Sequence, residues 1–282
     1  MNIDLPALAR RARNPRRKST TFRDIIPPAT LATDLYRTAY LPIVSLWQGA
    51  TDRIVAEYER SLSALTTDSS ADLASILEAI GNDFLRLLLE LQPGLRDWTL
   101  RTERWQRAKW RGAVLSATGV DLDTLLTVGD VAETLQQVLD WNLALIRDVS
   151  AQASQRIGNA VFAGLQNRTP ARDVAKAIRE ATGMARDRSQ RIAADQLQKL
   201  TAGLADERRK QAGLSTWEWV HSRKRHPRTT HRERDGNLYS SDPAVVGTEV
   251  GGKTVAAEPE RNDMPGRPPY CGCRSRGVIV WA

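Results

Sequence analysis

The stretch VAETLQQVLDWNLALIRDVSAQASQRIGNAVFAGL, residues 131–165, decides the fold class. Its apolar residues recur three and four positions apart, from Val131 through Val149 to Leu165, with the polar Asn142 on the same face. This period predicts an amphipathic helix of about 35 residues, roughly 50 Å long at ~1.5 Å per residue. A helix of this length indicates a bundle-like or extended helical body.

The same reasoning, applied outward from this stretch, predicts three more helices. Each combines an apolar stripe with residues suited to begin or end a helix. The first is expected at residues 73–91, with Ser69 or Ser70 as its cap and Pro93-Gly94 as its stop. The second is expected at residues 170–182, between the cap Thr169 and Gly183. The third is expected at residues 185–211 and ends at Gly213.

The pattern changes after residue 214. Residues 217–220 and 277–281 are rich in β-branched and aromatic side chains and predict strands, and residues 245–255 predict a glycine-containing hairpin. We therefore expect an α+β protein, with a mainly α-helical N-terminal body and a small C-terminal α+β module of about 70 residues.

Positive charge is concentrated in two places. The chain carries a net charge of +8, of which residues 221–234 contribute +5 and residues 1–23 contribute +6. So much like charge with few apolar residues predicts that residues 1–28 form a flexible basic arm. An arm of this kind can neutralise phosphates of double-stranded DNA or grip an acidic protein surface. Its candidate DNA-contacting residues are Arg10, Arg11, Arg13, Arg16, Arg17, Lys18 and Arg23.

The start of the chain does not resemble an export signal, because its apolar run is short and arginines follow at once. No apolar run approaches the roughly 18 residues that span a bilayer. We expect a protein of the cytoplasm with no membrane partner. Cys271 and Cys273 are too close together to be the framework of a disulfide-rich fold, so free thiols or a shared ligand are expected.

One ordered series of short motifs carries the functional information. A helical Ile-Ala-Ala-Asp-Gln segment at residues 192–196 precedes the tail, and the tail itself contains Trp217 and Trp219, Arg228 and His231 in an Arg-x-x-His, Asp235-Gly236, Pro265-Gly266, and Cys271-Gly272-Cys273. This series resembles the phage Mu protein F-like family of head morphogenesis, or minor capsid, proteins. The resemblance covers about residues 170–282 and departs from the family pattern at two points. Ala194 and Gly272 stand where the family usually has arginine, with an arginine displaced to Arg274.

The resemblance implies a domain organisation and a function. Residues 29–168 would form the helical body and residues 169–282 the Mu F-like head morphogenesis domain. The protein would be a structural component of the prohead and virion, located in the capsid interior near the portal and made in the host cytoplasm. Its implied partners are the portal protein and the major capsid or scaffold protein. It would aid capsid assembly and DNA packaging, and possible further roles are contact with DNA and ejection with the genome.

The cysteines and histidines of the tail allow two interpretations. Cys271, Cys273 and His231, with His226 or His221, offer the thiolate and imidazole donors of a structural zinc site. Structural sites usually space their cysteines more widely, however, and a Cys-x-Cys places both thiols on one face of a strand. The plainer interpretation is that the thiols are small buried fillers. On that interpretation no cofactor is expected.

Asp235-Gly236 has a structural explanation, because glycine tolerates positive φ and aspartate hydrogen-bonds its own turn. The alternative function is a metal-dependent nuclease or other enzyme that uses a cluster of His231, Asp235, Cys271 and Cys273. Since local carboxylates are few, we expect the protein not to be an enzyme and assign no catalytic residue.

Overall fold

The computed structural model describes residues 3–10, 17–64, 69–123 and 125–281. The chain divides into two compact units, and neither is continuous in the sequence. One unit consists of Met1–Ala29, Thr99–Val138 and Ala194–Ala282, and the other of Thr30–Trp98 and Leu139–Ala193. The α+β class expected from the sequence, with a helical N-terminal part and a small C-terminal sheet, is confirmed.

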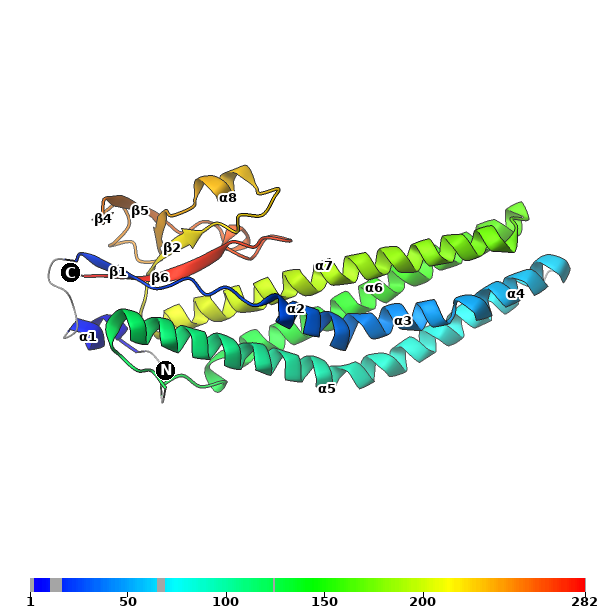
Figure 1. The fold of residues 1–282 in the computed structure, drawn as a ribbon, viewed down its shortest axis with the longest axis horizontal. Coiled ribbons are helices and arrows are strands. Elements are labelled where there is room, and N and C mark those ends of the chain that lie inside the picture. Colours follow the sequence, from blue (N-terminus) through cyan, green and yellow to red (C-terminus); the bar gives the residue numbers. More distant parts are fainter. Residues whose placement is uncertain (1–2, 11–16, 65–68, 124, 282) are drawn as a thin grey trace. The chain divides into compact units, whose positions relative to one another are not determined.

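Long helices run through both units (Figure 1). The unit formed by Thr30–Trp98 and Leu139–Ala193, here called the helical unit, also contains shorter helices and one π-helical turn. These follow one another before the first long helix. The bounds are Ala29–Leu35 for α2, Tyr36–Tyr40 for the π-helix η2, Leu41–Gly49 for α3, Thr51–Ala64 for α4, Ser69–Thr118 for α5, Ala132–Asn167 for α6 and Ala171–Gln211 for α7.

The predicted helix at residues 131–165 corresponds to α6, and its polar interruption has a partner. Asn142 is fully buried, and its Oδ1 accepts a hydrogen bond of 2.9 Å from the Tyr40 hydroxyl. Two turns further on, the Trp47 indole donates to Ser150 at 3.0 Å. A buried polar atom without a partner would cost stability, so these pairs explain how polar groups fit on an apolar helix face.

Two of the predicted helix ends are wrong. Helix α5 continues through Pro93 to Thr118, and α7 continues through Gly183 to Gln211. A proline inside a helix costs about 3 kcal/mol or more, because it removes one backbone hydrogen bond. Burial outweighs this cost in α5, where Leu91, Leu95 and Trp98 are buried on either side of Pro93. Gly213, with φ of 67°, does end α7 as predicted.

The other unit, here called the sheet unit, contains a six-stranded sheet within the described residues, in the order β1-β6-β2-β3-β5-β4. Neighbouring strands are antiparallel except for the parallel pair β3–β5. The predicted hairpin is present, with Gly251 and Gly252 at positive φ in its two-residue turn. The bounds are Ser19–Thr21 for β1, Thr216–Val220 for β2, Leu238–Ser240 for β3, Glu249–Val250 for β4, Lys253–Ala257 for β5 and Arg274–Val280 for β6.

The expectation that residues 1–28 form a flexible arm is wrong for residues 3–10 and 17–28, which the structure describes. Helix α1 (Leu5–Ala9) buries Leu5, and β1 pairs with β6 from the opposite end of the chain (Figure 1). Phe22 is 1% exposed and packs edge-on against Trp110, with ring centroids 5.6 Å apart. Ile3, Leu5 and Phe22 therefore enter a core. Of the arginines that the structure describes here, Arg10, Arg17 and Arg23 are exposed.

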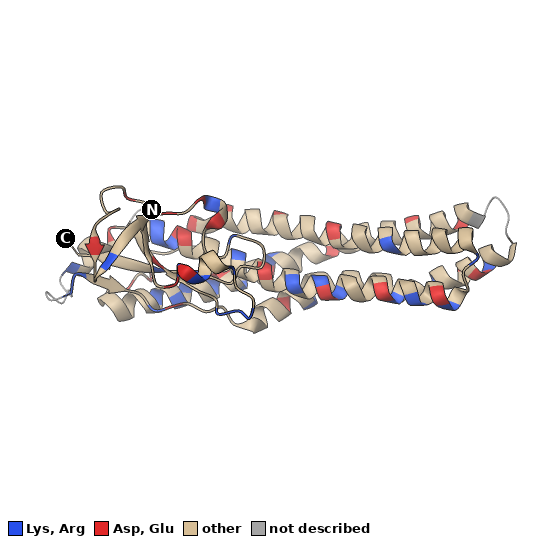
Figure 2. Ribbon diagram, turned by 90° about the horizontal axis from the view of Figure 1, so that it is seen from above, with Lys and Arg blue, Asp and Glu red and all other residues tan. Residues whose placement is uncertain are grey.

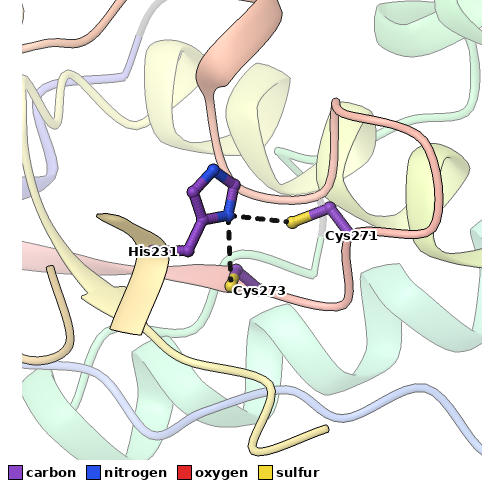
Figure 3. A group of neighbouring side chains, drawn as sticks. All are labelled: His231, Cys271 and Cys273. Atoms are coloured by element: carbon purple, nitrogen blue, oxygen red, sulfur yellow. Dashed lines mark hydrogen bonds between the residues drawn. The ribbon is translucent and has the colours of Figure 1, made fainter. Parts of the chain in front are cut away.

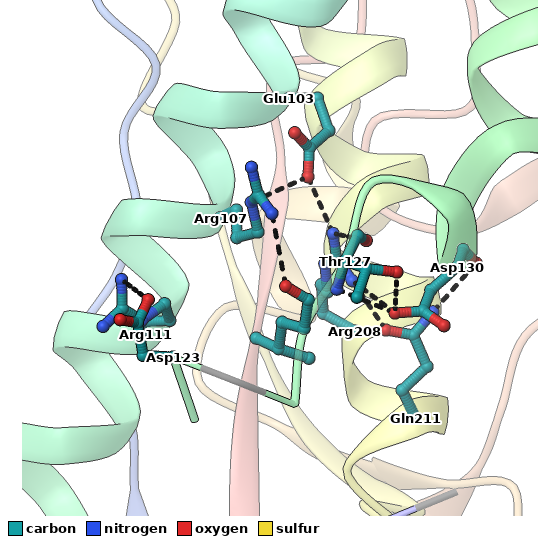
Figure 4. Close-up of polar contacts among 9 residues, drawn as sticks. Glu103, Arg107, Arg111, Asp123, Thr127, Asp130, Arg208 and Gln211 are labelled. Carbon is teal, nitrogen blue, oxygen red and sulfur yellow. Dashed lines mark hydrogen bonds and ion pairs between the residues drawn. The ribbon is translucent and has the colours of Figure 1, made fainter. Parts of the chain in front are cut away.

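A buried ion pair connects α5 and α7 in this unit (Figure 4). Arg208 and Glu103 both have fully buried side chains, and Nη2 donates to Oε1 at 2.7 Å. The same Nη2 donates to the carbonyl of Thr127, and Nη1 donates to Gln211 at 2.9 Å. These bonds fix the connection that leads, by way of the 3-10 turn η3 (Gly129–Val131), into α6.

Acidic and basic residues are interspersed along the long helices (Figure 2). None of the helices in the described ranges is both long enough and apolar enough to cross a membrane.

Candidate functional site, a buried thiol and imidazole cluster

A histidine meets two cysteines that follow it by about 40 positions in the sequence (Figure 3). His231 lies on the short helix α8 (Thr229–Glu233), and Cys271 and Cys273 lie in the loop directly before β6. Nδ1 of His231 is 3.5 Å from Sγ of Cys271 and 3.7 Å from Sγ of Cys273. The three residues are 2%, 4% and 3% exposed. The cluster is thus a compact, buried set of one nitrogen and two sulfur atoms.

The other ring nitrogen of His231 is held by a carboxylate. Nε2 lies 2.9 Å from Oδ1 of Asp263, in the 3-10 turn η4 (Arg261–Asp263), and Oδ2 of Asp263 accepts from Arg234 at 2.6 Å. Burial opposes ionisation of Asp263, but the hydrogen bonds from His231 and Arg234 outweigh it and hold its pKa below the ordinary value. The ring edge of Trp219, at a centroid distance of 4.9 Å, fixes the plane of the imidazole.

The cysteine loop is held by the helix motif and by a glycine turn. Tyr270 has a φ of 58°, and its N–H donates to Oδ1 of Asp195 on α7 at 2.6 Å. Gly266 has a φ of 78°, and a Cβ there would lie 2.7 Å from Cβ of Ala202. The aspartate of the Ile-Ala-Ala-Asp-Gln segment and the glycine of Pro-Gly therefore position the loop that carries both thiols.

The departure from the family pattern at the cysteines, Gly272 with the arginine displaced to position 274, has a structural counterpart. A Cβ on Gly272 would lie 2.7 Å from Cε of Lys224, whose ammonium group donates to the Tyr270 carbonyl. The Lys224 side chain thus occupies the space beside position 272. The displaced arginine, Arg274, makes a bidentate pair with Asp24, its Nη2 lying 2.6 Å from Oδ2. This pair fastens the segment that follows β1 to the start of β6.

The two thiols affect each other's ionisation. A hydrogen bond from Cys273, with smaller contributions from backbone N–H groups and His231, lowers the pKa of the Cys271 thiol to about 5 against the effect of burial. The pKa of Cys273 is raised, because its proton is shared with Cys271 and because it is buried. The cluster therefore favours one thiolate next to one imidazole.

The two tryptophans of the motif series form the wall behind the thiols. Trp217 and Trp219 lie on β2 and pack in one apolar cluster with Tyr239, Cys271 and Cys273. Trp217 stacks on Tyr239 at 4.9 Å and donates to Glu258 at 2.6 Å. Both indoles are buried and serve the core of the module.

Asp235 does not join the cluster. Its Oδ1 accepts from the backbone N–H of His221 at 2.9 Å, and Gly236 has a φ of 79°. The positive φ of Gly236 is that expected for an Asp-Gly turn, but the printed hydrogen bond of Asp235 goes to the His221 backbone and not to its own turn. Arg228 is exposed and donates to the carbonyl of Pro269 at 3.1 Å, and His226 is exposed as well. The structure therefore brings together His231 and the two cysteines, but not the full set of residues in the enzyme alternative.

The basic residues of the N-terminal segment lie apart from this cluster in the sequence. Arg10, Arg17, Lys18 and Arg23 are exposed. Arg11, Arg13 and Arg16 lie outside the described residues.

Sequence reasoning did not identify Asp263, Asp24 or Lys224. Each is a single charged residue in a polar segment, and each acts only because the fold places it beside a group at least 30 positions away. The sequence signal that could have indicated these residues is the concentration of charges around the motif residues. It does not distinguish these three residues from their charged neighbours.

The fold and the cluster define an α+β protein whose small C-terminal sheet module is built around a buried Cys-x-Cys and histidine. Residues 155–276 match the family described as Phage Mu protein F like protein, which confirms the family resemblance. A protein of Haemophilus influenzae, named only as an uncharacterized protein, is 26% identical over 157 residues. The match covers 55% of this chain and 32% of that protein, so the chain spans about a third of its relative. No solved structure gives a significant match.

Proposed function

We propose that the protein is a minor head protein of a tailed phage that acts in head morphogenesis inside the prohead, at the portal. The observation that carries the proposal is the family match over residues 155–276. Its partners are then the portal protein and the major capsid or scaffold protein.

The way the motif residues are used supports an architectural role. Trp217, Trp219 and Gly266 fill or shape the core, and Asp195 and Asp235 each accept a backbone hydrogen bond. Conformational constraints of this kind define a rigid module. A module with loops held in this way suits a protein that docks on other components of a particle.

The location is tested in particles. Proheads and virions from the phage that encodes this chain would be purified, their proteins identified by mass spectrometry, and the chain located by electron microscopy relative to the portal. We expect a small number of copies beside the portal vertex. Particles that assemble and package DNA without this chain would refute the proposal.

We also propose that the exposed basic residues of the N-terminal segment contact packaged DNA. Each phosphate contact contributes about 0.9 to the slope of log affinity against log salt. Neutralising four of these residues together should reduce that slope by up to about 3.6 and weaken binding to duplex DNA of any sequence. The variant combines Arg10→Gln, Arg17→Gln, Lys18→Gln and Arg23→Gln.

The matched control removes the same number of exposed charges from the helical unit. It combines Arg53→Gln, Arg86→Gln, Lys176→Gln and Arg179→Gln, all at exposed positions. If both variants lose DNA affinity equally, the net charge of the protein and not the N-terminal segment is responsible. If neither loses affinity, the segment does not contact DNA.

A further inference from the structure

The geometry of the thiol and imidazole cluster is that of a tetrahedral metal site. Zinc lies about 2.3 Å from thiolate sulfur and about 2.0 Å from imidazole nitrogen, so tetrahedral ligands place sulfur and nitrogen about 3.6 Å apart. Nδ1 of His231 lies 3.5 Å and 3.7 Å from the two sulfur atoms. All three ligand atoms lie within 4.8 Å of one another. The two nitrogen–sulfur distances are therefore those expected for ligands of one tetrahedral ion.

The hydrogen bond of His231 favours the tautomer that binds metal. Nε2 faces Asp263 at 2.9 Å, and an ionised carboxylate can only accept a hydrogen bond, so Nε2 carries the proton. Nδ1 then presents its lone pair to the two sulfur atoms. A carboxylate behind a ligating histidine is the usual outer partner at zinc sites, where it fixes the ring and raises the basicity of the ligand.

The chemistry and burial of the donors select the metal. Two thiols and an imidazole suit zinc, whereas magnesium and calcium require oxygen ligands. Both cysteines are free and almost fully buried, and no disulfide joins them. Cys271 and Cys273 precede β6 and do not lie within it, so the objection that a Cys-x-Cys presents both thiols on one strand face does not apply.

We propose that His231, Cys271 and Cys273 bind one zinc ion and that Asp263 positions His231 for this purpose. Three protein ligands leave one tetrahedral position for a water molecule. A cavity of about 340 Å³ is lined by all three ligands and also by His221. Nδ1 of His221 accepts from the N–H of Arg223, and its buried Nε2 has no hydrogen-bond partner in the described part of the chain. This donor suits a water in the fourth position.

The proposed ion connects three segments, in addition to the hydrogen bonds from Arg234 to Asp263 and from Arg228 to Pro269. These are α8, the turn η4 through Asp263, and the loop before β6. A metal that binds the folded chain more tightly than the unfolded chain stabilises the fold. The role assigned to zinc is therefore structural, and the proposal does not depend on the head protein function.

The first test uses the full-length protein, purified under reducing conditions, and Co²⁺ in place of zinc. We expect one equivalent of zinc by elemental analysis and, after exchange, the intense near-ultraviolet absorption of thiolate bound to Co²⁺. Protein that was incubated with excess zinc, carries no bound metal and shows no such absorption with Co²⁺ would overturn the proposal.

Variants then identify the ligands. Cys273→Ser should abolish stoichiometric zinc binding, and Asp263→Asn should weaken zinc affinity about 10- to 100-fold in competition with a chromophoric chelator. Asp263→Asn leaves all three ligands in place, so it remains informative if the cysteine variant does not fold. The matched control is Asp235→Asn, an acidic residue of the same module that contacts the His221 backbone and none of the ligands. Equal zinc affinity in Asp263→Asn and the control would contradict the positioning role of Asp263. Full zinc content in folded Cys273→Ser would contradict the proposed zinc site.

Discussion

At the scale of single residues, Arg208 and Glu103 show how the chain uses a buried charge. Burial lowers the pKa of Arg208, and the neighbouring Glu103 opposes this effect. The guanidinium bonds to a carboxylate, a carbonyl and an amide, so most of its donors are used. Oε2 of Glu103 has no hydrogen-bond partner within the described ranges. The pair is thus held by several contacts on the arginine side and few on the glutamate side.

Replacing the arginine should be strongly destabilising. Arg208→Met leaves Glu103 buried with Arg107 as its remaining cation at 3.3 Å, and loss of one partner of a buried pair costs about 3–5 kcal/mol. The double variant Glu103→Leu with Arg208→Met removes both charges and should regain much of that loss. Urea unfolding followed by circular dichroism measures both. A double variant that is less stable than Arg208→Met alone would contradict this account.

At the scale of elements, α7 shows that a glycine need not end a helix. Gly183 lies inside the helix, and a Cβ there would meet nothing within 4 Å. Gly213, which ends the same helix, has a φ of 67°, and a Cβ there would lie 2.9 Å from the carbonyl oxygen of Ile3. The two glycines look alike in the sequence and differ in the space and backbone conformation that the fold gives them.

These two positions should respond oppositely to alanine. Gly183→Ala should stabilise the protein by about 0.4–1 kcal/mol, because the unfolded chain loses conformational freedom and the folded chain meets no obstacle. Gly213→Ala should be destabilising by more than that, because alanine disfavours positive φ and has no room. The midpoints of urea unfolding compare the two. A loss of stability in Gly183→Ala would mean that α7 is interrupted at that residue.

At the scale of the whole molecule, the two ends of the chain are joined. The N-terminal segment provides β1 beside β6 and places Phe22 in the core of the sheet unit. Arg274 then pairs with Asp24, two residues beyond Phe22. The described residues of this basic segment are therefore part of the folded unit, with Arg10, Arg17 and Arg23 exposed on its surface.

Phe22→Ala tests this arrangement. Removal of a buried phenylalanine costs about 3–5 kcal/mol, and the same loss is expected here. The control is Leu8→Ala, because Leu8 lies in the same segment and is 51% exposed. Thermal unfolding measured by calorimetry should show a clearly lower Tm for Phe22→Ala and little change for the control. Equal Tm values for the two variants would mean that Phe22 does not pack in the core and that the segment is flexible.

The sequence by itself determined the features that depend on neighbours along the chain. Apolar periodicity predicted α6 and the buried faces of α5 and α7, and Asp235-Gly236 and Gly251-Gly252 predicted turns. Local geometry is enough for these because helix faces and turns involve residues only a few positions apart. The ordered motifs also predicted the family, and the thiol and imidazole groups among them were the candidate metal ligands.

Tertiary structure alone decided the rest. The local preferences of Pro93 and Gly183 favour the end of a helix, but burial on both sides of Pro93 outweighs that preference in α5. The same holds for the N-terminal segment, whose few apolar residues gain a core only when β6 is beside them. Asp263 orients His231 across 32 positions. Contacts of this range depend on the packing of the whole chain, and no local pattern in the sequence encodes them.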